Sequence, residues 1–237
     1  MPATTAFHWF LPTGGDARDL GGAAHGTGIG AAAAAPVAAD RPATLGYLTQ
    51  LAQAADQLGY DAVLTPTGAH CEDAWMTTAA LIAATRRLRF LVAFRPGLVE
   101  PALAAQTAAT FQRLSGGRLL LNAVAGGSGA EQRGYGDRLG RDARYARAEE
   151  FLDVVRTAWR GIPYDHAGPH YRIDGGHLRR PPEPAPRIHF GGSSDPAFEV
   201  AARLAEYRDA GVDEFVLSGC PHLEEAYTFA EHVRPLL

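Results

Sequence analysis

The sequence predicts an α/β protein built around a parallel β-sheet, and two observations support this. Short apolar runs, each ended by Gly, Pro or Ser, alternate with segments whose apolar residues recur every three or four positions. Strands buried on both faces of a parallel sheet are near-continuous apolar runs, and amphipathic helices have the three-to-four period. Repeated units of this kind form either a doubly wound sheet or a (β/α)₈ barrel.

Six segments are expected to be strands, because each is a short apolar run that ends in a turn. They are Phe7–Leu11, Ala62–Thr65, Arg89–Phe94, Leu119–Val124, Arg187–Phe190 and Glu214–Leu217. A complete barrel has eight strands, so this count is two short of a barrel.

The segments between these strands have helical periodicity. Apolar stripes with the three-to-four spacing begin at Leu45, Leu103, Ala148, Val200 and Leu223. Helices of this kind cover a sheet with their apolar faces.

Two of the joints between a helix and the following strand are alike. Gly59 and Gly211 each stand just after a helical stripe and just before a strand. Glycine most easily adopts the left-handed conformation with which many helices end. The likeness indicates that one βα unit is repeated along the chain.

Two stretches fall outside the βα pattern. Gly14–Pro42 is a long loop rich in Gly and Ala. Its Gly26–Gly30 segment is similar to a dinucleotide-binding fingerprint, but it follows no strand, so we interpret it as part of the loop. Ile162–Pro186 is expected to be a two-stranded excursion with Tyr164–Tyr171 as its hairpin.

Composition narrows the class of protein. The chain has 237 residues, of which 46% are hydrophobic and 20% charged, which is typical of a globular protein. A net charge of −4 argues against a nucleic-acid binder, and two cysteines are too few for a disulfide framework. No apolar run is long enough for a membrane span, and the first residues lack the features of a signal peptide. We therefore expect a soluble cytoplasmic enzyme.

The turn after the fifth expected strand has features of a phosphate site. Gly192, Ser193 and Ser194 stand between a strand and an expected helix. Glycine lets the backbone approach an anion, and serine hydroxyls and N–H groups at a helix N-terminus can hold a phosphate. The same residues could instead form an ordinary helix cap, with Pro196 in the first turn.

Other catalytic motifs have weaker support. The nine histidines include no pair at helical spacing and no His-Glu-x-x-His run, so no metal site is expected. No Gly-x-Ser-x-Gly turn points to a serine hydrolase. Cys71 and Cys220 each follow a strand, where either could be a nucleophile or simply a packed side chain.

The strand-end motifs together resemble the flavin-dependent alkanesulfonate monooxygenases, a family of bacterial-luciferase-like (β/α)₈ barrels. The likeness covers nearly the whole chain outside Gly26–Ala39. The matching segments are His8–Thr13, Thr65–Gly68, Cys71–Trp75, Phe90–Pro96, Arg144–Tyr145, Phe190–Asp195, Phe215–Gly219 and Pro221–Tyr227.

The resemblance implies a two-component system. A separate NAD(P)H-dependent FMN reductase delivers reduced FMN, and the monooxygenase uses it with O₂ to cleave the C–S bond of an alkanesulfonate, giving aldehyde and sulfite. Cys71 would lie beside the flavin and favour binding of its reduced form. Arg95 could bind the sulfonate, although an arginine at a strand end can also pair with a carboxylate. The implied flavin contacts are Thr67, Asn122 and Tyr145, with Gly192, Ser193 and Ser194 on the phosphate.

The chain departs from the family pattern in one large way. Family members have much more chain between the Gly-Gly-Ser-Ser helix and the last βα unit, whereas here the two are joined near Ala202 and Arg203. The missing segment would hold two strands and most groups that bind the sulfonate. Cys220 also replaces a family tyrosine, and Gly14 and Arg141 replace family histidines.

The expected fold is therefore a luciferase-like TIM (β/α) barrel over residues 1–237 that is incomplete, with about six of eight βα units. Bare sheet edges favour packing between subunits, so a homo-oligomer is expected. Three functions remain open: an alkanesulfonate monooxygenase impaired by the deletion, a degenerate flavin-binding barrel without catalysis, and a luciferase-like oxidoreductase with another substrate.

Overall fold

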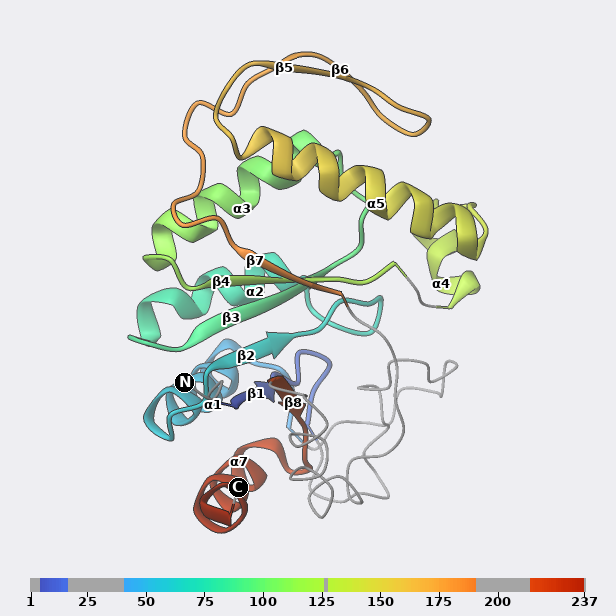
Figure 1. Ribbon diagram of the computed structural model, residues 1–237. Coiled ribbons are helices and arrows are strands. Elements are labelled where there is room, and N and C mark those ends of the chain that lie inside the picture. Colours follow the sequence, from blue (N-terminus) through green and yellow to red (C-terminus); the bar gives the residue numbers. More distant parts are fainter. Residues whose placement is uncertain (1–4, 17–40, 126–127, 191–213, 237) are drawn as a thin grey trace. The chain divides into compact units, whose positions relative to one another are not determined.

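The computed structural model describes residues 5–16, 41–125, 128–190 and 214–236. Its main feature is a six-stranded sheet with the order β7-β4-β3-β2-β1-β8 (Figure 1). The strands are β1 (Ala6–Phe10), β2 (Ala62–Thr65), β3 (Arg89–Phe94), β4 (Leu119–Ala123), β7 (Arg187–Phe190) and β8 (Glu214–Leu217). All six predicted strands are confirmed.

The order of the strands distinguishes the two architectures that the sequence left open. Neighbouring strands follow one another in the chain, and β8 pairs in parallel with β1, where Phe7 lies opposite Phe215. A doubly wound sheet instead reverses its strand order at a switch point. Consecutive order, with the last strand beside the first, is the order of a (β/α) barrel.

The barrel is incomplete. Strands β7 and β8 stand at the two ends of the described row, and residues 191–213 separate them in the chain. The expected shortage of two strands in this stretch falls on residues outside the described ranges, so its place stays a prediction.

Four of the five predicted helical stripes form helices, and the stripe at Val200 lies outside the described residues. The α-helices are α1 (Leu45–Gln57), α2 (Ala74–Leu81), α3 (Pro101–Ser115), α4 (Gly129–Gly134), α5 (Arg141–Ala158) and α7 (His222–Thr228). Short π and 3₁₀ turns extend α7 to Leu236, and another 3₁₀ turn follows α2. No helix in the described ranges combines the length and apolar character needed to cross a bilayer.

Helices α2 and α4 were not predicted. Helix α2 has no apolar stripe, since Met76 is exposed while Thr78 is buried. Helix α4 has only six residues, which is too short for a periodicity to show. The start of α2 does have a sequence signal, because the Asp73 carboxylate accepts a hydrogen bond from the Met76 N–H at 2.8 Å.

The chain forms two compact units, which we describe separately. The first unit comprises Met1–Val92 and Ser193–Leu237, and the second comprises Ala93–Gly192. The sequence predicted one domain over residues 1–237, and this stays a prediction.

The first unit is held by a core beneath α1 and α7. Trp9 of β1 is buried, and its ring centroid lies 5.4 Å from that of Tyr60. The Tyr60 hydroxyl donates to the Ala226 carbonyl at 2.7 Å, which ties α7 to the joint between α1 and β2. Gly59 in that joint has φ +76°, as expected for a left-handed helix stop, whereas Gly211 lies outside the described residues.

The second unit packs α3 against α5, with the hairpin of β5 (Tyr164–Ala167) and β6 (Arg172–Gly176) beside them (Figure 1). The Trp159 indole N–H donates to the Ala105 carbonyl at 3.1 Å and joins the two helices. The predicted two-stranded excursion is confirmed, but the predicted hairpin Tyr164–Tyr171 holds only β5 and the turn, because β6 begins at Arg172 and ends at Gly176.

Glu150 of α5 holds the hairpin in place. Its carboxylate accepts hydrogen bonds from the backbone N–H groups of His170 and Tyr171, both at 3.0 Å, and pairs with His166 Nε2 at 2.9 Å. Desolvation raises the pKa of Glu150, but these hydrogen bonds outweigh it and the net pKa is lowered. The carboxylate is therefore ionised in the folded protein at neutral pH.

Replacing Glu150 with glutamine is expected to lower the free energy of unfolding by about 1–3 kcal/mol at neutral pH, the scale of a lost hydrogen bond to a charged group. Because the folded-state pKa is depressed, the stabilisation is present above the ordinary value of 4.5 and is lost as pH falls through the lowered pKa. Denaturant unfolding at neutral pH and well below pH 4.5 should show the difference shrinking in acid. Glu149→Gln, at the exposed neighbouring position, is the control. A difference that is the same at both pH values would contradict this role.

Candidate functional site

The loops that follow β1 and β2 meet in the first unit. The Glu72 N–H donates to the Thr13 carbonyl at 3.1 Å. Gly14 lies so close to the second loop that a Cβ there would be 2.8 Å from the His70 carbonyl oxygen. A larger residue at position 14 would push the loops apart, so the histidine of the resembling family does not fit this arrangement.

These loops line an open cavity of about 440 Å³. Small-molecule sites are commonly about 300–1,000 Å³, so its volume is suitable for a ligand. Thr13 is buried, and its hydroxyl has no hydrogen-bond partner among the described residues. Buried polar groups without partners are rare, and a bound polar ligand would satisfy this one. The lining residues are Thr13, Gly14, Pro42, Ala43, Ala69, His70, Cys71 and Glu72.

Two predicted site residues belong to this loop pair. Cys71 is half-buried in the cavity wall, which is consistent with its predicted place beside a ligand. Thr67 is half-buried just after β2, on the same loop as Cys71. Thr13 was not predicted, because a threonine after a strand has no distinguishing pattern until its burial is known.

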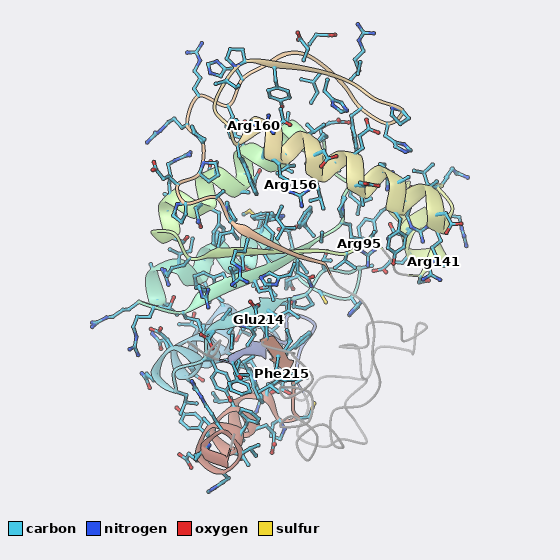
Figure 2. The ribbon with its side chains drawn as sticks, in the orientation of Figure 1. Arg95, Arg141, Arg156, Arg160, Glu214 and Phe215 are labelled. Carbon is cyan, nitrogen blue, oxygen red and sulfur yellow. The ribbon has the colours of Figure 1, made fainter. Side chains whose placement is uncertain are left out.

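Arg95 lies at the carboxyl end of β3, in the second unit (Figure 2). Its side chain is only 7% exposed. The Nη2 group donates to a Glu131 carboxylate oxygen at 2.7 Å, and the guanidinium carbon lies 5.6 Å from the centroid of the Tyr135 ring. The Nε and Nη1 groups are buried and have no hydrogen-bond partner among the described residues.

This arrangement leaves Arg95 with donors for an anion. A guanidinium has five N–H donors in a fixed planar fork, and that fork matches carboxylate, phosphate and similar oxyanions. Glu131 offsets part of the charge and fixes the orientation of the side chain. Either a sulfonate or a carboxylate was expected as the partner of Arg95, and a carboxylate, Glu131, is present. Glu131 itself was missed because α4 was missed.

The remaining predicted flavin contacts do not belong to the loops after β1 and β2. Asn122 of β4 is half-buried and lies opposite His189 of β7 in the sheet register. Tyr145 is exposed on α5, with its ring centroid 5.8 Å from the Arg141 guanidinium carbon. These two residues belong to the second unit, and their roles stay predictions. The predicted phosphate contacts, Gly192, Ser193 and Ser194, lie outside the described residues.

A further group of side chains was not predicted. Asp16, Cys220 and His222 place their potential ligand atoms within 4.8 Å of one another in the first unit. Cys220 and His222 are close in sequence, but Asp16 is 206 positions away from His222. Sequence spacing could have drawn attention to the Cys-Pro-His run, but not to its carboxylate partner.

Comparison with known proteins identifies the family. A family model described as luciferase-like monooxygenase matches residues 5–212. The chain belongs to the luciferase-like monooxygenase family. This result confirms the predicted fold class, an incomplete luciferase-like barrel, and the luciferase-like monooxygenase family. The narrower resemblance to the alkanesulfonate monooxygenases stays a prediction.

Solved structures of luciferase-like proteins share the fold. An EDTA monooxygenase (EmoA) from Chelativorans sp. BNC1 has 20% identity and a TM-score of 0.66, covering 98% of this chain and 68% of that one. A long-chain alkane monooxygenase (LadA) has 18% identity and a TM-score of 0.67, covering 92% and 64%. The oxygenating constituent of a 3,6-diketocamphane monooxygenase from Pseudomonas putida, in complex with FMN, has 19% identity and a TM-score of 0.59, covering 98% and 64%.

These luciferase-like neighbours differ from the chain mainly in length. The chain is covered almost completely, yet it spans only about two thirds of each neighbour. Together with the short connection between β7 and β8, this difference is consistent with the expected loss of a segment near Ala202 and Arg203, two residues outside the described ranges.

Proposed function

We propose that this chain is the oxygenating component of a two-component system, which uses reduced FMN and O₂ to oxidise a small alkanesulfonate to aldehyde and sulfite. The observation that most supports an anionic substrate is Arg95, with two buried donors that have no partner among the described residues. A sulfonate is an anion with three oxygens, so it can accept from both donors.

The cavity between the loops that follow β1 and β2 has residues that would suit FMN. Thr13 supplies a buried hydroxyl that needs a partner, and Cys71 supplies a half-buried thiol in the wall. Thr67, Asn122 and Tyr145 are the other proposed contacts of the ring system, and Gly192, Ser193 and Ser194 those of its phosphate. The bound flavin supplies the activation of O₂.

The chain's own residues would bind and orient the substrate. Arg95 would hold the sulfonate through Nε and Nη1, while Glu131 keeps the guanidinium plane fixed through Nη2. Cys71 would contact the cofactor and would not form a covalent bond to the substrate. A separate NAD(P)H-dependent reductase would supply the reduced flavin, and we further propose a homo-oligomer.

A second candidate is a flavin-binding protein with little or no catalysis. It is favoured by the connection between β7 and β8, which is too short for two βα units. In the resembling family that region supplies most sulfonate contacts and the loop that closes over the substrate. In a site that does not exclude water, the reduced flavin and O₂ form hydrogen peroxide instead of oxidising the substrate.

The two candidates differ in what the chain makes from octanesulfonate in the presence of a reductase, FMN, NADH and O₂. We expect more sulfite than in a mixture without this chain. We also expect O₂ to reoxidise most of the reduced flavin without attack on the sulfonate, which gives hydrogen peroxide. Sulfite release should be measured alongside peroxide release. No sulfite above the control would reject the monooxygenase in favour of the second candidate. Efficient sulfite release with little peroxide would show that the missing segment is not needed.

A further inference from the structure

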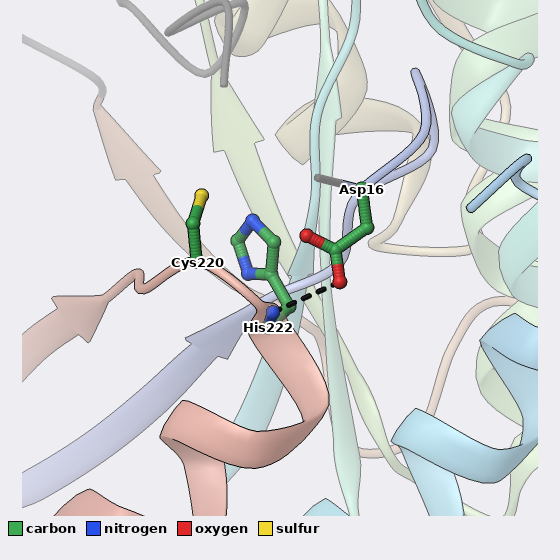
Figure 3. A group of neighbouring side chains, drawn as sticks. All are labelled: Asp16, Cys220 and His222. Atoms are coloured by element: carbon green, nitrogen blue, oxygen red, sulfur yellow. Dashed lines mark hydrogen bonds between the residues drawn. The ribbon is translucent and has the colours of Figure 1, made fainter. Parts of the chain in front are cut away.

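Three potential metal ligands meet at the carboxyl ends of β1 and β8 in the first unit. Asp16 follows β1, Cys220 follows β8, and His222 is the first residue of α7. Their ligand atoms lie within 4.8 Å of one another. Figure 3 shows the His222 imidazole between the Cys220 thiol and the Asp16 carboxylate. Neither the proposed flavin contacts nor Arg95 belong to this cluster.

The cluster is held in place by the surrounding structure. Asp16 and Arg41 exchange two backbone hydrogen bonds, of 2.8 and 3.0 Å. One Asp16 carboxylate oxygen, Oδ2, accepts from the His222 backbone N–H at 2.9 Å and from the Tyr47 hydroxyl. Figure 3 shows the other oxygen directed toward the imidazole and the thiol. The carboxylate is therefore oriented with one oxygen toward the centre of the cluster.

The imidazole provides independent evidence for a ligand. His222 is 1% exposed, and its Nδ1 atom has no hydrogen-bond partner among the described residues. A buried imidazole nitrogen without a partner, beside a thiol and a carboxylate, is a suitable ligand for a metal ion.

A Cys-His-Asp catalytic triad does not fit the same contacts. In such a triad the carboxylate accepts from the imidazole, which in turn activates the thiol. Here the carboxylate instead accepts from the backbone of His222 and from Tyr47. A bound cation would instead stabilise the thiolate form of Cys220.

The donor set selects the kind of cation. One sulfur, one nitrogen and one oxygen suit zinc and similar ions, whereas calcium and magnesium prefer oxygen alone. Zinc bonds of about 2.0–2.3 Å place tetrahedral ligands about 3.3–3.8 Å apart, so a small closure of the three side chains would form the site. The carboxylate and a thiolate would together balance a double positive charge.

We propose that Asp16, Cys220 and His222 bind one divalent transition-metal ion of the zinc class, with a fourth position open to water or another ligand. Catalytic zinc sites share this pattern of three protein ligands and one exchangeable position. The proposal departs from the sequence expectation of no metal, which considered only histidines close together in the chain. It does not rest on the proposed flavin function.

Cobalt(II) titration of chelator-treated protein without a purification tag tests the site directly. We expect one equivalent of Co²⁺ to give a thiolate-to-cobalt charge-transfer band and the visible bands of four-coordinate cobalt, and Zn²⁺ to abolish both. The chain has two cysteines, so each can be removed in turn. Cys220→Ser should lose the charge-transfer band, and the matched control Cys71→Ser should keep it. The absence of a stoichiometric band, or its loss only in Cys71→Ser, would overturn the proposal.

A second measurement uses the unaltered chain, so that it does not depend on a variant folding. Peptide mapping after iodoacetamide treatment reports the alkylation of each thiol with and without one equivalent of Zn²⁺. We expect Zn²⁺ to protect Cys220 at least tenfold and to leave Cys71 unchanged. Equal alkylation of Cys220 with and without the metal would show that zinc does not bind its sulfur, and would overturn the proposal.

Discussion

Replacing Phe151 with alanine should lower the free energy of unfolding by about 3–5 kcal/mol, the scale of a large aromatic side chain removed from a packed core. Phe151 of α5 is 1% exposed, and its ring centroid lies 5.9 Å from those of both Phe94 and Tyr171. It therefore joins the end of β3 to α5 and to the hairpin. Denaturant unfolding monitored by circular dichroism measures the loss.

A surface position on the same helix is the matched control. Arg156 is 56% exposed and pairs only weakly with Asp153, at 3.3 Å on the surface. Arg156→Ala should change the stability by less than about 0.5 kcal/mol. A loss of stability in Phe151→Ala no larger than in this control would contradict the described packing of Phe151 in the core of the second unit.

Replacing Arg95 with methionine should weaken the binding of octanesulfonate about tenfold to a hundredfold. A hydrogen bond to a charged group contributes about 1.5–3 kcal/mol, which corresponds to that range of affinity. The substitution also leaves Glu131 without its 2.7 Å partner, so Arg95→Met should be compared with the double variant Arg95→Met/Glu131→Gln. Calorimetric titration measures the affinity in each variant.

Octanol distinguishes loss of the anion contact from general damage to the site. Arg95→Met should weaken the binding of octanesulfonate and leave the binding of octanol unchanged, because only the sulfonate needs the guanidinium donors. Arg133→Met, an exposed position on α4, should affect neither ligand. Equal weakening of both ligands by Arg95→Met would contradict an anion-binding role.

Strands β1 to β4 could be predicted closely because most of their residues are buried on both faces. All four residues of β2 are buried, for example, so the strand stands out in the sequence as an apolar run. Helix α2 could not be predicted from periodicity, since its exposed Met76 and buried Thr78 run against the expected pattern. The cap at Asp73 was the only local signal of its start.

The candidate site was predictable only where chemistry coincides with a strand end. Cys71 and Arg95 were chosen in this way, and their roles stay predictions. Cys71 lines the cavity, and Arg95 has two buried donors without a partner among the described residues. Thr13 is a candidate site residue only because its buried hydroxyl has no partner among the described residues, and no sequence pattern predicts this. The Asp16 carboxylate reaches His222 only because β8 pairs with β1, a contact between opposite ends of the chain.

We expect this luciferase-like chain, which spans about two thirds of its structural neighbours, to bind reduced FMN. Anaerobic titration of reduced FMN, followed by flavin absorbance or calorimetry, tests it most directly. We predict saturable binding of one FMN per chain, and at least tenfold weaker binding in Ser194→Asp, where a carboxylate would stand beside the flavin phosphate. Absence of saturable binding would contradict the expected binding itself, and unchanged affinity in Ser194→Asp would contradict the predicted position of the phosphate.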